Sequence, residues 1–116
     1  MYDPAPSIII LHAGGMSRFE LIDRICQGIE EEGIPFVIRA DEETDSLRLS
    51  WKAAHASRLN VGIGVGLDDA IAVHDTRMKE DTPVFQEWES ELREPKVLGV
   101  NAARLVKGLP FKGFKK

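Results

Sequence analysis

The hydrophobic residues near the start of the chain form first a continuous run and then a helical stripe. Residues 7–11, "SIIIL", are rich in β-branched side chains, a pattern typical of a strand buried on both faces. Further along, Ile22, Ile25, Cys26 and Ile29 recur at the i, i+3, i+4, i+7 spacing of one helix face. We therefore predict a buried strand followed by an amphipathic helix.

Both ends of this predicted helix carry sequence signals. Ser17 and Glu20 have the spacing of a capping box, in which two side chains satisfy backbone N–H groups at a helix start. Gly33 suits the left-handed position after a helix end, and Pro35 just beyond it prevents continuation. The helix thus ends at three consecutive glutamates, residues 30–32, which face the negative end of the helix macrodipole.

The middle of the chain predicts a second strand and helix, followed by two adjacent strands. Residues 36–38 have strand character, and the acidic residues 41–45 suit the start of a helix. The apolar face of that helix comprises Leu47, Trp51 and Ala54.

A glycine-rich strand comes next. Residues 61–66, "VGIGVG", and residues 70–74, "AIAVH", are joined by a link too short for a helical crossover, so they should be antiparallel neighbours. Alternation places three glycines on one face of the first of these strands (Gly62, Gly64 and Gly66). Because glycine weakens a strand, something should lie very close to that face. We expect an internal helix there, with a partner or a ligand as the alternative.

The last third of the chain predicts one short strand and one helix. Residues 83–85 suit an edge strand, and Pro95 begins a helix that ends at residues 108–110. One side of this helix is apolar (Leu98, Ala102, Leu105 and Val106).

Together these elements predict an α/β fold in a single domain, residues 1–110, followed by a basic C-terminal tail, residues 111–116. The order of strands and helices favours three layers, α/β/α, around a mixed sheet of four or five strands. Most of the strands should be parallel, and the fourth should be antiparallel.

Composition narrows the class of protein. The 116 residues suffice for one domain, and 43% hydrophobic with 29% charged residues is ordinary for a soluble globular protein. The net charge of −4 argues against general nucleic-acid binding, which needs a basic surface. A single cysteine excludes an internal disulfide and suits a reducing cytosol. We expect neither a membrane span nor a signal peptide, since no apolar run is long enough and residues 1–4 lack a basic region.

Few residues suggest chemistry, and we expect no catalytic and no cofactor-binding residues. His12, Gly14 and Gly15 follow the first strand, where open α/β sheets bind ligands, but no nucleophile and base accompany them. The glycines of "VGIGVG" lack the spacing of a phosphate loop. Neither His55 nor His74 has metal-ligand spacing, and we interpret them as an exposed helix residue and a strand-end residue. Cys26 belongs to the core stripe and should be inert.

The three glutamates of residues 30–32 leave two interpretations open. The simpler one is a solvated surface. The functional one is that a carboxylate serves a partner's cation or a metal shared across an interface, because Mg²⁺ often takes one or two carboxylates from each contributor.

Four motifs extend the interpretation. The segments "GIEEEGIP", "VGIGVG", "TPVF" and "LGVNAARLVKGLP" follow one another between residues 8 and 110. In this order they resemble the small subunit of the diol and glycerol dehydratase-reactivating factors, whose fold is like that of the medium subunit of the dehydratase.

The resemblance implies a non-catalytic subunit of a chaperone-like complex of two large and two small subunits. The large subunit carries the ATPase, and the factor exchanges subunits with a dehydratase inactivated by damaged adenosylcobalamin, so that the spent cofactor leaves. The small subunit then has no cofactor of its own. A family glutamate in "EE-x-G" completes a Mg²⁺ site built mainly by the large subunit; by alignment it is Glu31, with Glu30 and Glu32 solvated beside it.

Two segments, residues 12–19 and 86–94, have no assigned counterpart in the family pattern and are candidate contact regions. Two other functions stay open: a medium-type subunit of the dehydratase itself, or a small-molecule-binding α/β domain or enzyme that uses His12. The resemblance implies a cytoplasmic location, with association with a bacterial microcompartment as an open alternative, and a role in propanediol utilization.

Overall fold

The order of elements along the chain follows the predicted alternation of strands and helices. The structure is a computed structural model that describes residues 5–113; residues 1–4 and the last three residues of the predicted basic tail lie outside it. The elements are β1 (Ile8–Ala13), α1 (Phe19–Glu31), β2 (Phe36–Asp41), α2 (Ser46–Ala56), β3 (Val61–Val65), β4 (Ala70–Asp75), β5 (Phe85–Trp88), the short 3-10 helix η1 (Glu89–Glu91) and α3 (Pro95–Lys107).

One mixed sheet lies at the centre of the fold, with the strand order β2-β1-β3-β4-β5. Strand β1 pairs in parallel with both β2 and β3, whereas β4 is antiparallel to β3 and to β5. It follows that β4 alone runs against the other strands, so the predicted mostly parallel sheet with an antiparallel fourth strand is confirmed.

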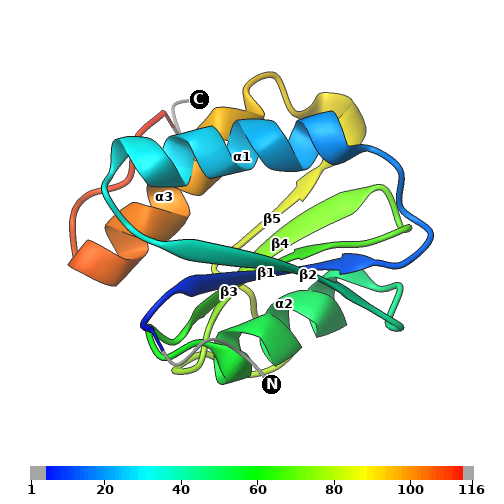
Figure 1. The fold of residues 1–116 in the computed structure, drawn as a ribbon, viewed down its shortest axis with the longest axis horizontal. Helices are drawn as coiled ribbons and strands as arrows, with labels where there is room; N and C mark the ends of the chain where they lie inside the picture. The colour runs from blue at the N-terminus through cyan, green and yellow to red at the C-terminus, as the bar shows by residue number, and fades with distance from the viewer. Residues whose placement is uncertain (1–4, 114–116) are drawn as a thin grey trace.

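Helices cover both faces of this sheet. Figure 1 shows α1 and α3 on one face and α2 on the other, which confirms the three predicted layers. The core between the layers is dominated by fully buried aliphatic side chains, among them Ile8, Ile10, Leu11, Ile22, Ile25, Ile29, Leu49, Ile63, Ile71 and Leu98. In residues 5–113, no helix is long and apolar enough to cross a membrane.

The glycine face of β3 lies directly against α2, as the sequence pattern predicts. An added Cβ at Gly62 would lie 2.1 Å from the backbone N of Ala54. At Gly64 it would lie 2.3 Å from the carbonyl oxygen of Ser46 and 2.4 Å from the N of Ser50. The helix backbone therefore occupies the space that a side chain would need, and only glycine permits this approach.

The buried face of α2 differs from the predicted apolar face. Its start is as predicted, because the Asp45 side chain accepts a hydrogen bond from the Arg48 N–H at 3.0 Å. The predicted face of Leu47, Trp51 and Ala54 is wrong in its first two members, which are only half-buried. The buried face is made of Leu49, Ser50, Ala53 and Ala54, because small side chains are needed where the helix rests on glycines.

The start of α1 also differs from the prediction. The residue before the helix is Arg18, no side chain caps the helix, and the proposed Ser17–Glu20 capping box is therefore wrong. The helix instead begins one residue later than expected, and the Arg18 N–H donates to the Met16 sulfur at 2.9 Å.

The end of α1 agrees with the prediction. Gly33 has φ +77°, its N–H donates to the Glu30 carbonyl at 3.0 Å, and the Ile34 N–H donates to the Ile29 carbonyl at 3.4 Å. These are the two hydrogen bonds of a Schellman motif, which only a left-handed residue such as glycine forms easily.

The remaining boundaries shift modestly. Strand β2 extends beyond the predicted residues 36–38, and the predicted edge strand at residues 83–85 is replaced by β5 at Phe85–Trp88. Helix α3 begins with Pro95 as predicted and ends at Gly108, which has φ +72°.

The packing of α2 on β3 predicts that Gly64→Ala destabilises the protein by roughly 1–3 kcal/mol or more, because its Cβ would meet helix backbone that can move only with the whole helix. Gly15→Ala is the matched control, since its nearest atom would be a leucine methyl 3.9 Å away. We expect the control to change the free energy of unfolding by no more than about 0.5 kcal/mol. Urea unfolding compares the two; equal stability of the two variants would contradict the packing argument.

Candidate functional site

The C-terminal half of α1 is held against α3 by a very close approach of the two helix backbones. An added Cβ at Gly28 would lie 2.1 Å from the Lys96 carbonyl oxygen, and one at Gly99 would lie 1.8 Å from the Ile25 carbonyl oxygen. Glycine at both contact points lets the helix axes come closer than any other residue would allow. This contact brings the end of α1, with its three glutamates, beside the charged side of α3.

Two of the three glutamates form ion pairs with α3. The Glu31 carboxylate lies 2.6 Å from the Lys96 ammonium, and both side chains are largely accessible, at 50% and 37%. The Glu32 carboxylate lies 2.9 Å from Lys107 and 3.3 Å from Arg104, and its side chain is only 14% accessible. The predicted solvated position is therefore wrong for Glu32, whereas Glu30 is exposed.

These cations explain why glutamates occur at the negative end of a helix. Besides its pairing with the Glu32 carboxylate, the Lys107 ammonium donates to the Glu32 backbone carbonyl at 2.8 Å, so it also satisfies a terminal helix acceptor. The hydrogen bond from Lys107 lowers the pKa of the Glu32 carboxyl, and Arg104 adds to this shift. The unfavourable dipole interaction is thus offset by charges from a different helix, which spacing within α1 could not reveal.

A further ion pair joins the middle of α1 to the residue before α3. The Arg24 guanidinium of α1 lies 2.5 Å from the carboxylate of Glu94, the residue before α3. Charged groups therefore line the α1–α3 contact along its solvent side, and two of the carboxylates, Glu31 and Glu94, are about half accessible.

The histidines have structural positions. His12 lies at the end of β1, where its Nδ1–H donates to the Ala13 carbonyl at 2.9 Å and its ring packs edge-on against Phe19. His74 in β4 is fully buried; its Nε2–H donates to the Glu80 carbonyl at 3.1 Å and its Nδ1 accepts from the Asp75 N–H at 3.0 Å. His55 is exposed on α2, as predicted.

Cys26 is buried in the α1 stripe, as predicted. Burial raises the pKa of its thiol to about 12, with smaller contributions from the nearby Asp23 and Glu30 carboxylates. A thiol with this pKa is almost entirely protonated at neutral pH.

The two segments without a family counterpart meet at one end of the sheet. Arg18, in the loop after β1, forms an ion pair with Glu89 of η1, and the Glu89 N–H donates to the Asp69 carbonyl at 2.8 Å. Residues 12–19 and 86–94 therefore contribute to one continuous surface, which the sequence alone did not indicate.

Within residues 5–113, the side chains considered above as candidates for chemistry do not come together in one site. No three histidine, cysteine, aspartate or glutamate side chains of the described residues lie close enough together to hold a metal ion. Gly14 and Gly15 border an open hollow beside Asp41 and Thr44, with His12 turned to its own strand. The arrangement offers charged surface for contact with another molecule.

The chain matches one protein family over nearly its whole length. The family described as dehydratase medium subunit matches residues 5–112. The propanediol dehydratase-reactivating factor small subunit of Citrobacter freundii is 38% identical over 108 residues, which cover 92% of this chain and 90% of that protein. A probable glycerol dehydratase-reactivating factor small subunit of the same organism is 31% identical over 113 residues, or 96% of this chain and 97% of that protein.

Solved structures show the same similarity. A chain in the structure of diol dehydratase-reactivating factor complexed with ADP and Mg²⁺ has a TM-score of 0.84 at 34% identity, covering 94% of this chain and 99% of that chain. A chain of glycerol dehydratase reactivase has a TM-score of 0.89 at 28% identity, covering 94% and 98%. The fold is therefore shared over nearly the whole of each chain compared.

The pairing of Glu32 predicts a stability that depends on pH. Because its pKa is lower in the folded than in the unfolded protein, the stabilisation is fully present above the unfolded value of about 4.3. It is lost as the pH falls through the lower folded pKa. Glu32→Gln should therefore lower the urea midpoint at pH 7, and its difference from wild type should shrink below about pH 4.

Glu30→Gln is the matched control for this experiment, because Glu30 is an exposed neighbour on the same helix end. It should leave the urea midpoint close to that of wild type. A Glu32→Gln variant as stable as wild type at pH 7 would show that the Arg104 and Lys107 contacts contribute nothing.

The burial of Cys26 predicts a thiol that reacts only on unfolding. At pH 8 a pKa of about 12 leaves roughly one thiol in ten thousand ionised. Reaction with Ellman's reagent should be at least about a thousandfold slower in buffer than in denaturant. Rapid reaction of the native protein would place Cys26 at an accessible surface.

Proposed function

Because the chain belongs to the dehydratase medium subunit family, we propose that it is the small subunit of a chaperone-like, ATP-dependent factor that reactivates an adenosylcobalamin-dependent diol or glycerol dehydratase. The observation that supports this most strongly is the end-to-end similarity, in sequence and fold, to reactivating-factor small subunits. In the proposed function the chain leaves its large subunit and exchanges with a dehydratase subunit, so that damaged cobalamin is released.

The chain contributes contacts to this process and no bond-making step. The glycines that resemble a phosphate loop are covered by α2, so the "VGIGVG" strand has no free backbone face for a nucleotide. His12 and His74 are engaged with backbone groups, and the Cys26 thiol is protonated and buried. On this proposal ATP hydrolysis belongs to the large subunit, in a complex of two large and two small subunits.

The surface proposed to meet the large subunit is the end of α1 that carries Glu31. Its carboxylate is half accessible and has one cation beside it among the described residues, Lys96, at 2.6 Å. One exposed carboxylate suits a Mg²⁺ ion that takes its remaining ligands from another chain, but it cannot hold the ion alone. Support comes from the similar reactivating factor, whose structure contains ADP and Mg²⁺.

On this proposal Lys96 has two alternative roles. In the free chain it neutralises Glu31, and in the complex it must move aside or contact the partner, because a divalent cation and an ammonium compete for the same oxygen. A bound Mg²⁺ would supply positive charge that links the two subunits.

The second candidate function is a medium-type subunit of the dehydratase itself, which the description of the matching family favours. The individual relatives reported above carry the names of reactivating factors and match this chain over 90% and 97% of their length. Copurification with an actin-like ATPase would support the first function, and copurification with dehydratase subunits alone would support the second.

The role of Glu31 predicts a binding defect that requires Mg²⁺. Glu31→Gln keeps the side-chain shape and removes one anionic ligand, so affinity for the large subunit should fall roughly tenfold, or about 1.4 kcal/mol, with Mg²⁺ present. With a chelator, variant and wild type should bind more nearly alike. Calorimetric titration of each chain into the large subunit, with and without Mg²⁺, measures both quantities.

Glu30→Gln is the matched control, because adjacent helix residues point about 100° apart and Glu30 should lie outside the metal site. It should bind like wild type in both conditions. If Glu31→Gln also binds like wild type in both, Glu31 is an ordinary surface residue and the shared Mg²⁺ site is wrong.

A further inference from the structure

The edge of the sheet formed by β5 lacks a second neighbouring strand in the described part of the chain. Strand β5 pairs with β4 only. The Glu89 N–H donates to the Asp69 carbonyl, so the backbone groups of Glu89, and of every second residue before it, point toward β4. Alternation along an antiparallel pair then turns the backbone N–H and C=O groups of Gln86 and Trp88 outward. Such an edge can accept an extended segment of another chain.

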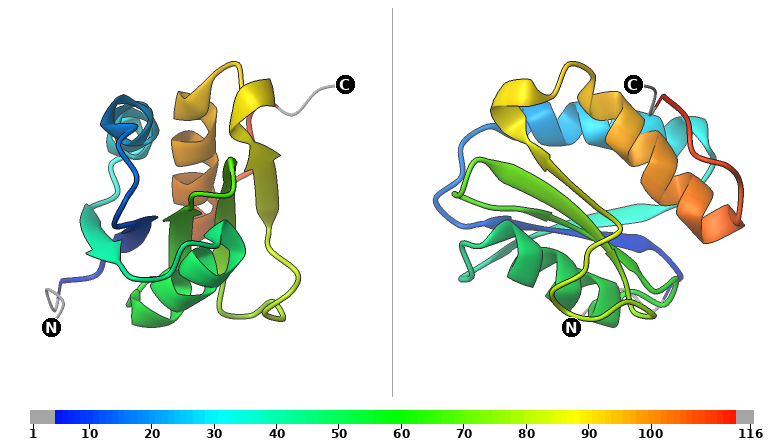
Figure 2. Two further views of the ribbon diagram at one scale, coloured as in Figure 1. Left: turned by 90° about the vertical axis from the view of Figure 1, so that its right-hand side faces the viewer. Right: turned by 180° about the vertical axis from the view of Figure 1, so that it is seen from behind.

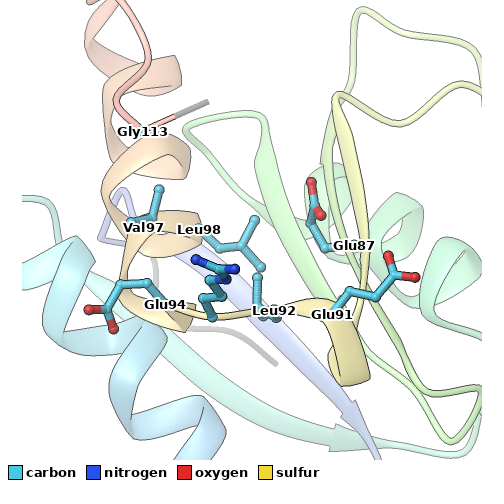
Figure 3. A pocket seen from close by; sticks show the side chains of 8 residues that line it. Glu87, Glu91, Leu92, Glu94, Val97, Leu98 and Gly113 are labelled. Atoms are coloured by element: carbon cyan, nitrogen blue, oxygen red, sulfur yellow. The ribbon is translucent and has the colours of Figure 1, made fainter. Parts of the chain in front are cut away.

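A groove lies directly beside this edge. Its volume is about 310 Å³, and it is bounded by β5 and η1 on one side and by the first turn of α3 on the other. Figure 3 shows Val97 and Leu98 approaching it from α3, with Leu92 below and with Glu87 and Glu91 on the opposite side. The groove therefore combines an apolar floor with carboxylates along its rim.

The charges of the groove favour a basic occupant. Of its three glutamates, Glu94 is paired with Arg24 at 2.5 Å, whereas Glu87 and Glu91 form no ion pair within residues 5–113. Arg93 is the single cation on the described lining, so carboxylates outnumber it. A lysine or arginine side chain with its apolar stem fits this combination of rim and floor.

The two faces of β5 carry different side chains, which indicates the residue pattern of an occupant. Glu87 points to the groove side, and its neighbour Trp88, which is 50% exposed, points to the other face of the strand. A strand added to β5 would therefore place alternate residues against carboxylates and against an indole ring. Cross-strand neighbours of this kind contribute to pairing in sheets.

From these observations we infer that the β5 edge and its groove bind an extended segment of a partner protein in which basic and apolar residues alternate. The segment adds to β5 through backbone hydrogen bonds and places a lysine or arginine between Glu87 and Glu91. Figure 2 shows α3 lying between α1 and β5, so this surface is separate from the Glu31 surface on α1. The inference does not depend on the proposed function.

The described part of the chain ends at Gly113 beside the groove, and the residues that follow it are a competing occupant. Asn101 holds the Lys112 backbone through hydrogen bonds of 2.8 and 2.7 Å, the Phe111 ring packs on Phe85, and Gly113 borders the groove. The sequence continues beyond the described residues as Phe-Lys-Lys. A test must therefore separate a partner's basic segment from the chain's own.

The test titrates the isotope-labelled full chain with the peptide acetyl-Val-Arg-Val-Lys-Val-amide and follows backbone amide shifts. We expect the shifts to concentrate in residues 85–98, and the peptide acetyl-Val-Glu-Val-Glu-Val-amide to cause none of comparable size. Glu87→Gln and Glu91→Gln should each weaken binding about three- to fivefold, the effect of removing one accessible ion pair. Glu42→Gln, an exposed acidic residue at the far end of β2, is the matched control and should bind like wild type.

Three outcomes would overturn the inference. One is equal binding of the basic and acidic peptides, and another is a set of shifts centred on a different edge, such as β2. The third comes from a chain truncated after Gly113: if the peptide binds only to the truncated chain, the groove belongs to the chain's own C-terminal residues and to no partner. Equal affinity of the full and truncated chains supports a groove that is open to a partner.

Discussion

The close contact between helix backbones and their neighbours is the constraint on which the rest of this structure depends. Glycines occur where α1 crosses α3 (Gly28 and Gly99) and where α2 rests on β3 (Gly62 and Gly64). At each of these positions a Cβ would lie within 2.3 Å of backbone atoms of the facing element. The α1–α3 contact within one layer and the contact of α2 with the sheet therefore occur at distances that only glycine allows, and the first of them sets the charged end of α1 against α3.

The proposed function follows from which groups this packing exposes and which groups it buries. The α1–α3 contact places Glu32 between Arg104 and Lys107, and leaves Glu31 half accessible beside Lys96. In contrast, the groups that could have suggested chemistry, the glycine strand and Cys26, are enclosed by the core. The proposed exchange of subunits would use a charged surface of this kind and would require no reactive group in the interior.

Local sequence signals predicted most of the fold, since Gly33 and Pro95 act on their immediate neighbours and the glycines of β3 are recognised by their alternation. The errors arose where a distant contact decides. The apolar face of α2 is set by the glycines of β3 beneath it. The partners of Glu31 and Glu32 lie on α3, 65 and 72 residues along the chain, so the sequence showed three unmatched glutamates and not their cations.

The central claim is that the charged end of α1, fixed by its glycine contact with α3, is the surface by which this chain joins a larger ATPase subunit. Hydrogen–deuterium exchange of the chain, free and mixed with that subunit, tests it most directly. The account predicts that binding slows exchange in the segment from Gly28 to Phe36 and in the facing part of α3. Slowed exchange confined to α2 or to the β3–β4 hairpin, with no change at the end of α1, would contradict it.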